Sequence, residues 1–369
     1  MKILTVVGAR PQFVKAAMVS KAILAHNARG EGERIEELIL HTGQHYDENM
    51  SEIFFSQMAI PRPTVMLNCG GGTHGAMTGK MLAEIEQALL AHKPDLTLVY
   101  GDTDSTLAGA LAAAKLHIPV AHVEAGLRSF NKAMPEELNR ICTDHVSDLL
   151  LCPTQEAISQ LKREGIEKGV HHVGDVMYDA ALVFGKIADA SSHILQDQSL
   201  ADKRYFLVTC HRAENTDAPQ RLLAIFEALK TLSSPEFPVV LPLHPRTRAR
   251  LEALGVDPAA LGLKILPPIS FLDMVALEKH AFAILTDSGG VQKEAYFHNV
   301  PCVTLRDETE WVETVDAGWN TLVGADKERI LAAAASLKSD GHSRKTIADY
   351  GDGHAADKVV GELIAMQKR

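Results

Sequence analysis

Short apolar runs alternate with amphipathic helical patterns along the whole chain, beginning at Ile3. Continuous runs rich in β-branched residues are typical of strands buried on both faces of a parallel sheet that is covered by helices. The pattern therefore predicts an α/β protein with parallel sheets. The predicted strands are 3–7, 37–41, 96–100, 120–123, 149–152, 206–209, 239–243, 264–266, 281–285 and 302–305, and the helices include 11–26, 75–92, 104–116, 135–147, 154–164, 219–234, 271–279 and 290–298.

The predicted strands and helices divide into two groups of similar size. Residues 165–205 lie between the groups and contain several glycines and the polar segment 191–203. The chain of 369 residues is long enough for two domains of ordinary size. We predict domains at 1–170 and 171–355, joined near 168–175. A last helix at 356–369 is expected to pack back onto the first domain, although its pattern alone does not decide this.

Composition excludes several classes of protein. The formal net charge of −10 argues against a general nucleic-acid-binding or membrane-binding surface. No apolar run reaches the roughly 20 residues that span a bilayer. The five cysteines have no paired spacing, and no group of residues has metal-ligand spacing. The sequence thus predicts a reduced cytoplasmic protein with buried thiols and no metal site.

A strand, a short glycine turn and a helix follow one another in the second half of the chain. The run 281–285 leads into Ser288, Gly289 and Gly290, after which a helical pattern resumes. Glycine lets the backbone approach a ligand closely, and a helix N-terminus attracts anions. Glu294, one turn inside the helix, could hold ribose hydroxyls. The turn is a candidate phosphate site, and an ordinary tight turn is the alternative.

Carboxylates follow two neighbouring strands in the first half. Asp102 comes after the third predicted strand and Glu124 after the fourth, and Glu136 and Glu137 open the next helix. Ligands of parallel α/β sheets bind beyond the carboxyl ends of the strands, so these acids could reach one site. Helix capping is the alternative for Asp102, and complementing the helix dipole is the alternative for Glu136 and Glu137.

Basic residues follow strands in both halves. Arg10 and Lys15 come after the first strand, His211 and His244 follow two strands of the second half, and Arg306 follows the strand that ends at Leu305. Each could be a surface or structural residue on its own. Together with the Ser-Gly-Gly turn, they predict a site for a phosphate or pyrophosphate.

These motifs resemble those of the non-hydrolysing UDP-N-acetylglucosamine 2-epimerase family. The similar stretches span residues 8–311 in the family's order: GARPQFVK, GDTDST, HVEAGLR, MPEELNR, CHRAEN, LTDSGGVQKEA and RDETEW. The resemblance implies two Rossmann-like domains in a GT-B-like arrangement, with parallel sheets facing across a cleft that holds a UDP-sugar. It also implies a homodimer that needs neither a metal nor a nicotinamide cofactor.

The resemblance also implies a reaction and roles for individual residues. UDP would be eliminated from the sugar to give a 2-acetamidoglucal-type intermediate, then re-added with inversion at C2, for the biosynthesis of cell-surface polysaccharide such as lipopolysaccharide O-antigen. The catalytic candidates are Asp102, Glu124, Glu136 and His211. The candidates for binding the substrate or UDP are Arg10, Lys15, Arg140, His211, His244, Phe271, Ser288, Gly289, Gly290, Glu294 and Arg306.

Three stretches are more similar to one branch, which acts on UDP-2,3-diacetamido-2,3-dideoxyglucuronate: GARPQF, TGQHYDENMSEIFF and GGTHGAMTGKML. The carboxylate on C5 of that sugar would find basic partners among Lys15, Lys80, Arg128 and Lys132. Many bacterial members hold a second UDP-sugar as an activator, partly through polar residues after a Gln-His motif. Here Gln44 and His45 are present but the later segment 68–74 differs, which puts the activator site in doubt.

Three alternatives remain open at this point. A hydrolysing 2-epimerase shares most of the motifs. A retaining glycosyltransferase with the same two-domain layout would not need the carboxylates of the first domain. A non-catalytic sensor of sugar nucleotides would leave those carboxylates unexplained.

Overall fold

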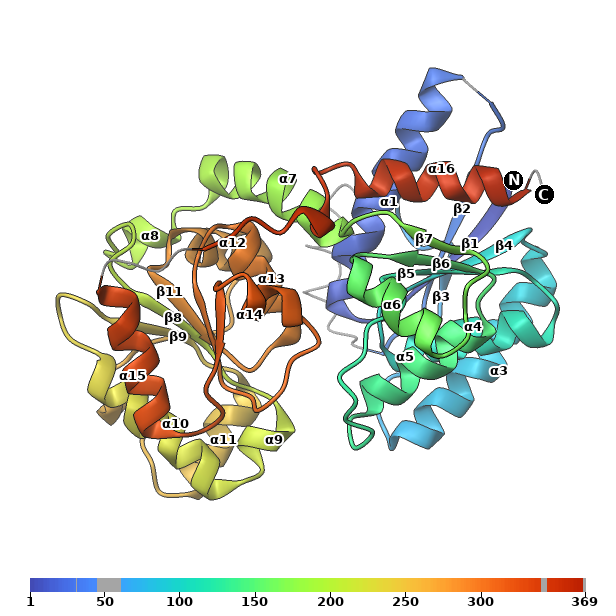
Figure 1. The fold of residues 1–369 in the computed structure, drawn as a ribbon. Coiled ribbons are helices and arrows are strands. Elements are labelled where there is room, and N and C mark those ends of the chain that lie inside the picture. The colour runs from blue at the N-terminus through green and yellow to red at the C-terminus, as the bar shows by residue number, and fades with distance from the viewer. Residues whose placement is uncertain (31, 45–60, 340–343, 368–369) are drawn as a thin grey trace. The chain divides into compact units, whose positions relative to one another are not determined.

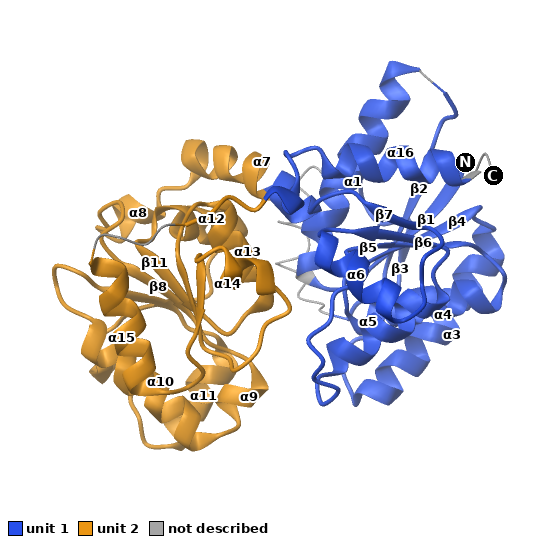
Figure 2. Ribbon diagram, viewed as in Figure 1, with its two compact units in different colours: residues 1–180, 348–369 blue, residues 181–347 orange. Residues whose placement is uncertain are grey.

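The computed structural model describes residues 1–30, 32–44, 61–339 and 344–367, which form two compact units (Figures 1 and 2). Unit 1 comprises residues 1–180 and 348–369, and unit 2 comprises residues 181–347. Each unit contains one parallel sheet with helices packed on it. The predicted α/β class with two parallel sheets is confirmed.

The sheet of unit 1 has seven parallel strands in the order β3-β2-β1-β4-β5-β6-β7. Their bounds are β1 Lys2–Val7, β2 Glu36–His41, β3 Val65–Met66, β4 Leu96–Tyr100, β5 Val120–Val123, β6 Leu149–Cys152 and β7 Val170–His172. The strand order reverses between β1 and β4: β2 and β3 lie on one side of β1, and β5, β6 and β7 lie on the far side of β4. β1 and β4 pair directly, from Ile3 with Leu96 to Thr5 with Leu98. Such a reversal opens a crevice at the carboxyl ends of the two strands.

Helices cover both faces of this sheet. Figure 1 shows α1 and α16 on one side and α3, α4 and α5 on the other. Apolar side chains of the sheet and of α3 pack together, among them Leu4, Val6, Met81 and Ile85, which are completely buried. The helices and the short 3-10 turn are α1 Arg10–Arg29, α3 His74–His92, α4 Asp104–Lys115, α5 Pro135–Val146, α6 Gln155–Arg163, α7 Val176–Ser191, η2 Ala348–Tyr350 and α16 Ala355–Gln367.

The boundary between the units lies inside α7, after Ala180, rather than at 170/171. The glycines and polar residues around 165–205 suggested a linker, whereas residues 176–191 form a helix whose first part has buried side chains. The last helix, α16, packs against α1 of unit 1. Its start is fixed by Asp179, whose carboxylate accepts hydrogen bonds from the backbone N–H groups of Ala355 (3.1 Å) and Ala356 (2.7 Å).

Unit 2 repeats the same construction with six parallel strands in the order β10-β9-β8-β11-β12-β13. The strands are β8 Phe206–Thr209, β9 Val239–Pro242, β10 Lys264–Leu266, β11 Ala283–Thr286, β12 Cys302–Thr304 and β13 Asn320–Leu322. The helices and the short 3-10 turn are α8 Ile194–Asp197, α9 Ala213–Thr216, α10 Pro219–Leu232, α11 Pro245–Ala253, η1 Pro258–Leu261, α12 Phe271–His280, α13 Gly289–Phe297, α14 Val312–Asp316 and α15 Lys327–Lys338. Here the reversal falls between β8 and β11.

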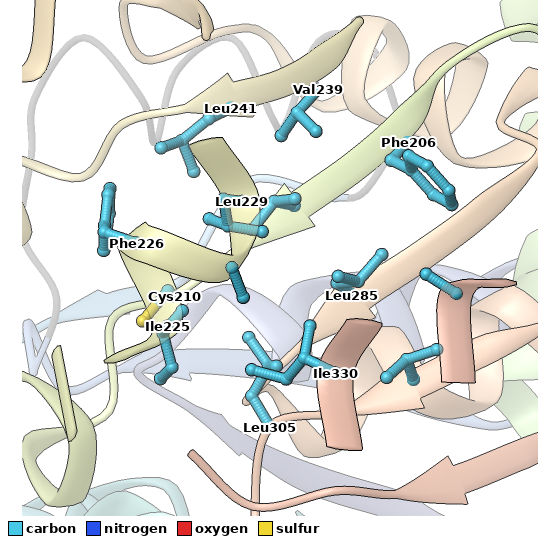
Figure 3. Packing of buried hydrophobic residues seen from close by; sticks show 14 of the residues in the cluster. Phe206, Cys210, Ile225, Phe226, Leu229, Val239, Leu241, Leu285, Leu305 and Ile330 are labelled. Carbon is cyan, nitrogen blue, oxygen red and sulfur yellow. The ribbon is translucent and has the colours of Figure 1, made fainter. Parts of the chain in front are cut away.

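The core of unit 2 joins α10 and α15 to the sheet. Figure 3 shows Phe206 and Leu285 of the sheet, Leu229 of α10 and Ile330 of α15 in this apolar cluster. All four side chains are completely buried. Close packing of this kind allows little movement, so the ends of β8 and β11 are held in fixed positions.

Two expectations from composition can be compared with the structure. Cys69, Cys152, Cys210 and Cys302 are buried free thiols, as predicted, whereas Cys142 is exposed on α5. None of the helices in the described part of the chain is both long and apolar enough to cross a membrane.

The packing of α16 on unit 1 predicts the effect of truncating Leu363, which is completely buried. Leu363→Ala should lower the free energy of unfolding by about 2–5 kcal/mol, because it removes apolar contacts and leaves a cavity. Urea unfolding followed by circular dichroism measures the change. Leu24→Ala in α1 is the matched control, because Leu24 is 55% exposed and should cost little. Equal stability of the two variants would contradict the assignment of α16 to the core of unit 1.

Candidate active site

Three carboxylates gather at one edge of the sheet in unit 1. Asp102 lies two residues beyond β4, Glu124 follows directly after β5, and Glu136 lies in the first turn of α5. The negative charges of Glu124 and Glu136 both act on the Asp102 carboxyl group, so the three acids share one electrostatic environment. The sequence placed each acid at a strand or helix end, and the order of β4 and β5 in the sheet brings those ends together.

Two buried cations separate these like charges. The Lys15 ammonium of α1 pairs with the Glu124 carboxylate. The Arg140 guanidinium of α5 lies 2.5 Å from Asp102 Oδ2 and 2.9 Å from Glu137 Oε2. Only 2% of the Arg140 side chain and 8% of the Lys15 side chain are exposed. Attraction between such poorly hydrated charges is strong, so these pairs fix the orientation of the acids.

The backbone next to two of the acids is in the left-handed region. Glu124 has φ +73° although it is not glycine, a conformation that costs of order 1–3 kcal/mol at such sites. Gly101 has φ +63°, and a Cβ there would lie 3.0 Å from Lys15 Nζ and 3.3 Å from Glu124 Oε1. Glycine at this position leaves room for the Lys15–Glu124 pair, and Glu124 carries strain of the kind that is stored at functional sites.

Capping does not explain Asp102. The N-cap of α4 is Thr103, whose hydroxyl accepts a hydrogen bond from the backbone N–H of Thr106 at 3.3 Å. Glu137, in contrast, has a structural role: its carboxylate accepts the backbone N–H groups of Ser129 (2.9 Å) and Phe130 (2.8 Å). Asp102 is therefore available for chemistry, and Glu137 holds the loop between β5 and α5.

The environments of Asp102 and Glu137 shift their acidities in opposite directions. Loss of water around the carboxyl group raises the pKa of Asp102, and the nearby anions add to this, although Arg140 and Lys15 oppose it. Burial would also raise the pKa of Glu137, but hydrogen bonds from Ser129 and Phe130 and the charge of Arg140 outweigh it and lower that pKa. Of the two acids, Asp102 is therefore the candidate for acid–base chemistry, and Glu137 keeps its structural role.

The Ser-Gly-Gly turn of unit 2 connects β11 to α13. Ser288 is the N-cap of α13, and its side chain makes no capping hydrogen bond. Its backbone N–H donates to Thr286 Oγ1 at 2.9 Å. Gly289 is packed so tightly against the Glu310 carboxylate that a Cβ would not fit, whereas Gly290 is exposed. The first N–H groups of an α-helix lack partners within the helix, so this turn can accept an anion.

Two histidines meet near this edge of the unit 2 sheet. His211 follows β8, His244 caps α11 after β9, and their ring centroids are 6.0 Å apart. Burial lowers the pKa of His211, and the positive charges of Arg212, His244 and Arg246 lower it further, although Asp287 opposes the shift. A cluster in which positive groups repel one another is suited to binding an anion.

Asp287 is a site residue to which the sequence analysis gave no role. It is completely buried and accepts the backbone N–H groups of His211 (3.1 Å) and Arg212 (3.0 Å). Asn215 Nδ2 also donates to it at 3.1 Å. Asp287 thus ties the loop after β8 to the end of β11. An acid between a buried strand and the Ser-Gly-Gly turn is the sequence signal that could have identified it.

Three arginines that the sequence analysis proposed for the substrate lie in buried ion pairs. Arg140 holds acids of unit 1, as described above. Arg306 lies 3.1 Å from Glu310 Oε2, and 1% of its side chain is exposed. Arg128 donates to both oxygens of Glu164 at 2.7 and 2.8 Å and is equally buried, so it is not open to a substrate carboxylate. The positions of these arginines in the sequence could not show which acids they pair with.

The remaining candidates have the following places. Arg10 is the first residue of α1, and Phe271, at the start of α12, packs edge-on against Phe184 with ring centroids 5.2 Å apart. Glu294 lies in the second turn of α13, and Lys80 donates to the backbone carbonyl of Asn68. His45 and most of the TGQHYDENMSEIFF stretch lie outside the described residues. Among the residues that are described, no three His, Cys, Asp or Glu side chains form a group that could hold a metal ion.

Comparison with known proteins identifies the family. A model of the UDP-N-acetylglucosamine 2-epimerase family matches residues 28–364. The chain belongs to this family. It is 52% identical to the UDP-2,3-diacetamido-2,3-dideoxy-D-glucuronate 2-epimerase of Pseudomonas aeruginosa, over 99% of this chain and all of that one. The predicted family is confirmed, and this similarity agrees with the branch that the motifs indicated.

Solved structures of family members have the same fold. The UDP-GlcNAc 2-epimerase of Methanocaldococcus jannaschii, in complex with UDP-GlcNAc and UDP, has a TM-score of 0.89 and 43% identity over 99% of this chain and all of that one. The Neisseria meningitidis enzyme bound to UDP-GlcNAc has a TM-score of 0.88 and 31% identity over the same shares. The epimerase family fold therefore extends over the whole chain.

The shifted pKa of Asp102 predicts how Asp102→Asn affects stability. Because this pKa is higher in the folded than in the unfolded protein, ionisation of Asp102 disfavours folding. Its stabilising contribution is present below the unfolded-state pKa and is lost as the pH rises through the folded-state pKa. The asparagine variant should therefore gain stability relative to the wild type between about pH 4 and pH 7. Urea unfolding at several pH values measures this difference.

Glu137→Gln is the control, and it should change the stability at neutral pH in the opposite direction. The lowered pKa of Glu137 means that its contribution is present at neutral pH and is lost as the pH falls through the folded-state pKa. Removing the charge leaves the buried Arg140 with one anionic partner fewer and should cost about 3–5 kcal/mol. If Asp102→Asn proves as destabilising as Glu137→Gln at neutral pH, the assignment of a raised pKa to Asp102 is wrong.

Proposed function

We propose that this epimerase inverts C2 of a UDP-linked 2-acetamido sugar, with UDP-2,3-diacetamido-2,3-dideoxy-D-glucuronate as the preferred substrate. The observation that carries the reaction type is the cluster of Asp102, Glu124 and Glu136, in which Arg140 pairs with Asp102 and Lys15 pairs with Glu124. The choice of sugar rests on the similarity to the Pseudomonas aeruginosa protein and on the branch motifs. UDP-GlcNAc is the alternative substrate, as in the names of the more distant relatives.

The chemistry requires several carboxyl groups. The hydrogen on C2 is only weakly acidic, so the bond between C1 and UDP breaks as the proton leaves. A carboxylate takes the proton, the C1–C2 double bond forms, and UDP departs as an anion. In the return step UDP attacks C1, and a carboxylic acid delivers a proton to the opposite face of C2. Two faces need two proton carriers, and the positive charge that develops on the sugar is stabilised by fixed carboxylates.

Asp102 is suited to carry one of these protons. Its raised pKa brings the protonated and ionised forms closer in energy near neutral pH, which favours proton exchange. It is also the more open acid, since 35% of its side chain is exposed compared with 10% of Glu124. Glu124 is held by Lys15 and its backbone is strained, so we assign it the fixed counter-charge and the proton transfer on the second face.

The basic residues of unit 2 serve the nucleotide in this proposal. His211 and His244 provide donors for the pyrophosphate, and the N-terminus of α13 at Gly289 and Gly290 provides backbone N–H groups. Neutralising the phosphates makes UDP a better leaving group. Arg10, at the start of α1, contributes in the same way, and Glu294 is assigned to the ribose hydroxyls.

We also propose, from the family resemblance, a cytoplasmic homodimer that supplies a sugar nucleotide to cell-surface polysaccharide, such as the O-antigen of lipopolysaccharide. Gel filtration coupled to light scattering tests the dimer.

Proton NMR of the purified protein with each UDP-sugar in D₂O tests the proposed function. Turnover should place deuterium at C2 of both epimers, because the C2 proton exchanges with solvent through the carboxyl groups. The kcat/KM should be higher for the diacetamido-glucuronate, and Glu124→Gln should abolish exchange. Product without deuterium would contradict the mechanism. A tenfold preference for UDP-GlcNAc, about 1.4 kcal/mol of transition-state free energy, would contradict the proposed substrate.

The environment of His211 predicts proton uptake when UDP binds. Its pKa is lowered in the free protein by burial and by neighbouring cations, and a bound pyrophosphate would favour the protonated ring. Calorimetric titration with UDP at about pH 7, in two buffers with different ionisation enthalpies, measures the uptake. His211→Asn should reduce it. Binding without proton uptake, or equal uptake by the variant, would place the pyrophosphate away from His211.

A further inference from the structure

His122 and Asp144 form an ion pair that the reaction described above does not use. His122 is the third residue of β5 and Asp144 lies in the last turn of α5. The distance from His122 Nδ1 to Asp144 Oδ1 is 2.7 Å, and both side chains are completely buried. The pair thus lies between the strand that leads to Glu124 and the helix that carries Glu136.

The hydrogen-bond partners define the charges of the pair. His122 Nε2 lies 2.8 Å from the backbone carbonyl of Gly101. A carboxylate and a carbonyl are both acceptors, so each ring nitrogen of His122 faces a hydrogen-bond acceptor. Burial would raise the pKa of Asp144, but hydrogen bonding and the charges of His122 and Arg128 hold it below its ordinary value. Asp144 is therefore a carboxylate.

The second carboxylate oxygen of Asp144 reaches another loop. Asp144 Oδ2 accepts the backbone N–H of Gly126 at 3.1 Å and a hydrogen bond from Arg128 at 2.7 Å. Gly126 lies two residues after Glu124, and Gly101 directly precedes Asp102. Through the Asp144 carboxylate and the His122 ring, the loops after β4 and β5 are both tied to α5.

The third acid is linked to the same point by the helix itself. Glu136, Arg140 and Asp144 are spaced four residues apart, so they lie along one face of α5 at successive turns. The ion pair with His122 therefore fixes the face that carries Glu136 and the Arg140 partner of Asp102.

We propose that Asp144 and His122 are positioning residues, which set the relative places of the three acids through Gly101, Gly126 and α5. This inference rests on the proposed function. Desolvation offsets much of the attraction in a buried ion pair, so such a pair contributes little net stability. Its hydrogen bonds are directional, however, and a displacement of about 1 Å at a reacting group can cost on the order of a hundredfold in rate.

Asp144→Asn tests the proposal. The amide nitrogen cannot accept hydrogen bonds, so either His122 or the Gly126 N–H loses its partner. The kcat should fall by about a hundredfold, while the Kd for UDP stays within about twofold, because the residues proposed for UDP lie mainly in unit 2. Glu164→Gln is the matched control: Glu164 also pairs with Arg128, but no described contact joins it to Gly101 or Gly126. It should keep near wild-type kcat even if it lowers the melting temperature.

A double-mutant cycle separates positioning from a general loss of structure. If Asp144 acts through Asp102, then Asp144→Asn should lower the residual rate much less in an Asp102→Asn background than in the wild type. If the rate of the double variant falls by the product of the two single losses, the proposal is overturned. A wild-type kcat in Asp144→Asn would also overturn it. If Asp144→Asn does not fold, His122→Gln replaces it, because the single amide nitrogen of glutamine cannot occupy the positions of both ring nitrogens and donate to both partners.

Hydrogen exchange provides a readout that does not depend on turnover. Asp144→Asn should speed amide exchange in peptides covering 101–104 and 124–128, and Glu164→Gln should not. Unchanged exchange in the first variant would overturn the positioning role. If wild-type protein turns over neither UDP-sugar while exchange changes as expected, the proposed function fails and the structural link stands.

Discussion

The active-site region of unit 1 depends on keeping like charges close together. Asp102, Glu124 and Glu136 would repel one another in a site from which water is partly excluded. Lys15 and Arg140, which are nearly inaccessible to solvent, supply the opposing charges. The pKa of Asp102 is still raised above its ordinary value, chiefly because its carboxyl group loses water, although Arg140 and Lys15 favour the ionised form.

The fold places this cluster through the order of its strands. In both units the strand order reverses at the middle of the sheet. The reversal lies between β1 and β4 in unit 1 and between β8 and β11 in unit 2. Loops that leave the carboxyl ends of such strands diverge and expose their polar residues. Asp102 follows β4, and His211 and the Ser-Gly-Gly turn follow β8 and β11, so both kinds of residue occupy such loops. One architectural rule therefore serves two different kinds of chemistry in the same chain.

The same loops contain the features that work against stability. Glu124 has a left-handed backbone, and the ionised form of Asp102 is disfavoured by the fold. The layers of helices and sheet instead bury apolar side chains, such as the cluster around Phe206 and Leu285. Buried anchors connect the two regions: Asp287 holds the loop after β8, and Asp144 reaches the loop after β5. Stability generated in the core thus maintains a strained site.

The sequence by itself determined the α/β class, most strand and helix positions and the family, because apolar periodicity and motif spacing are local properties. It did not reveal the two- and three-residue edge strands β3, β7 and β13, which are too short to show a period. It also did not show which acids pair with Arg128, Arg140 and Arg306, and it gave Asp287 no role. Only the tertiary structure decided these points, because a side chain's partner and its access to water depend on residues far away in the chain, such as Arg140 and Asp102.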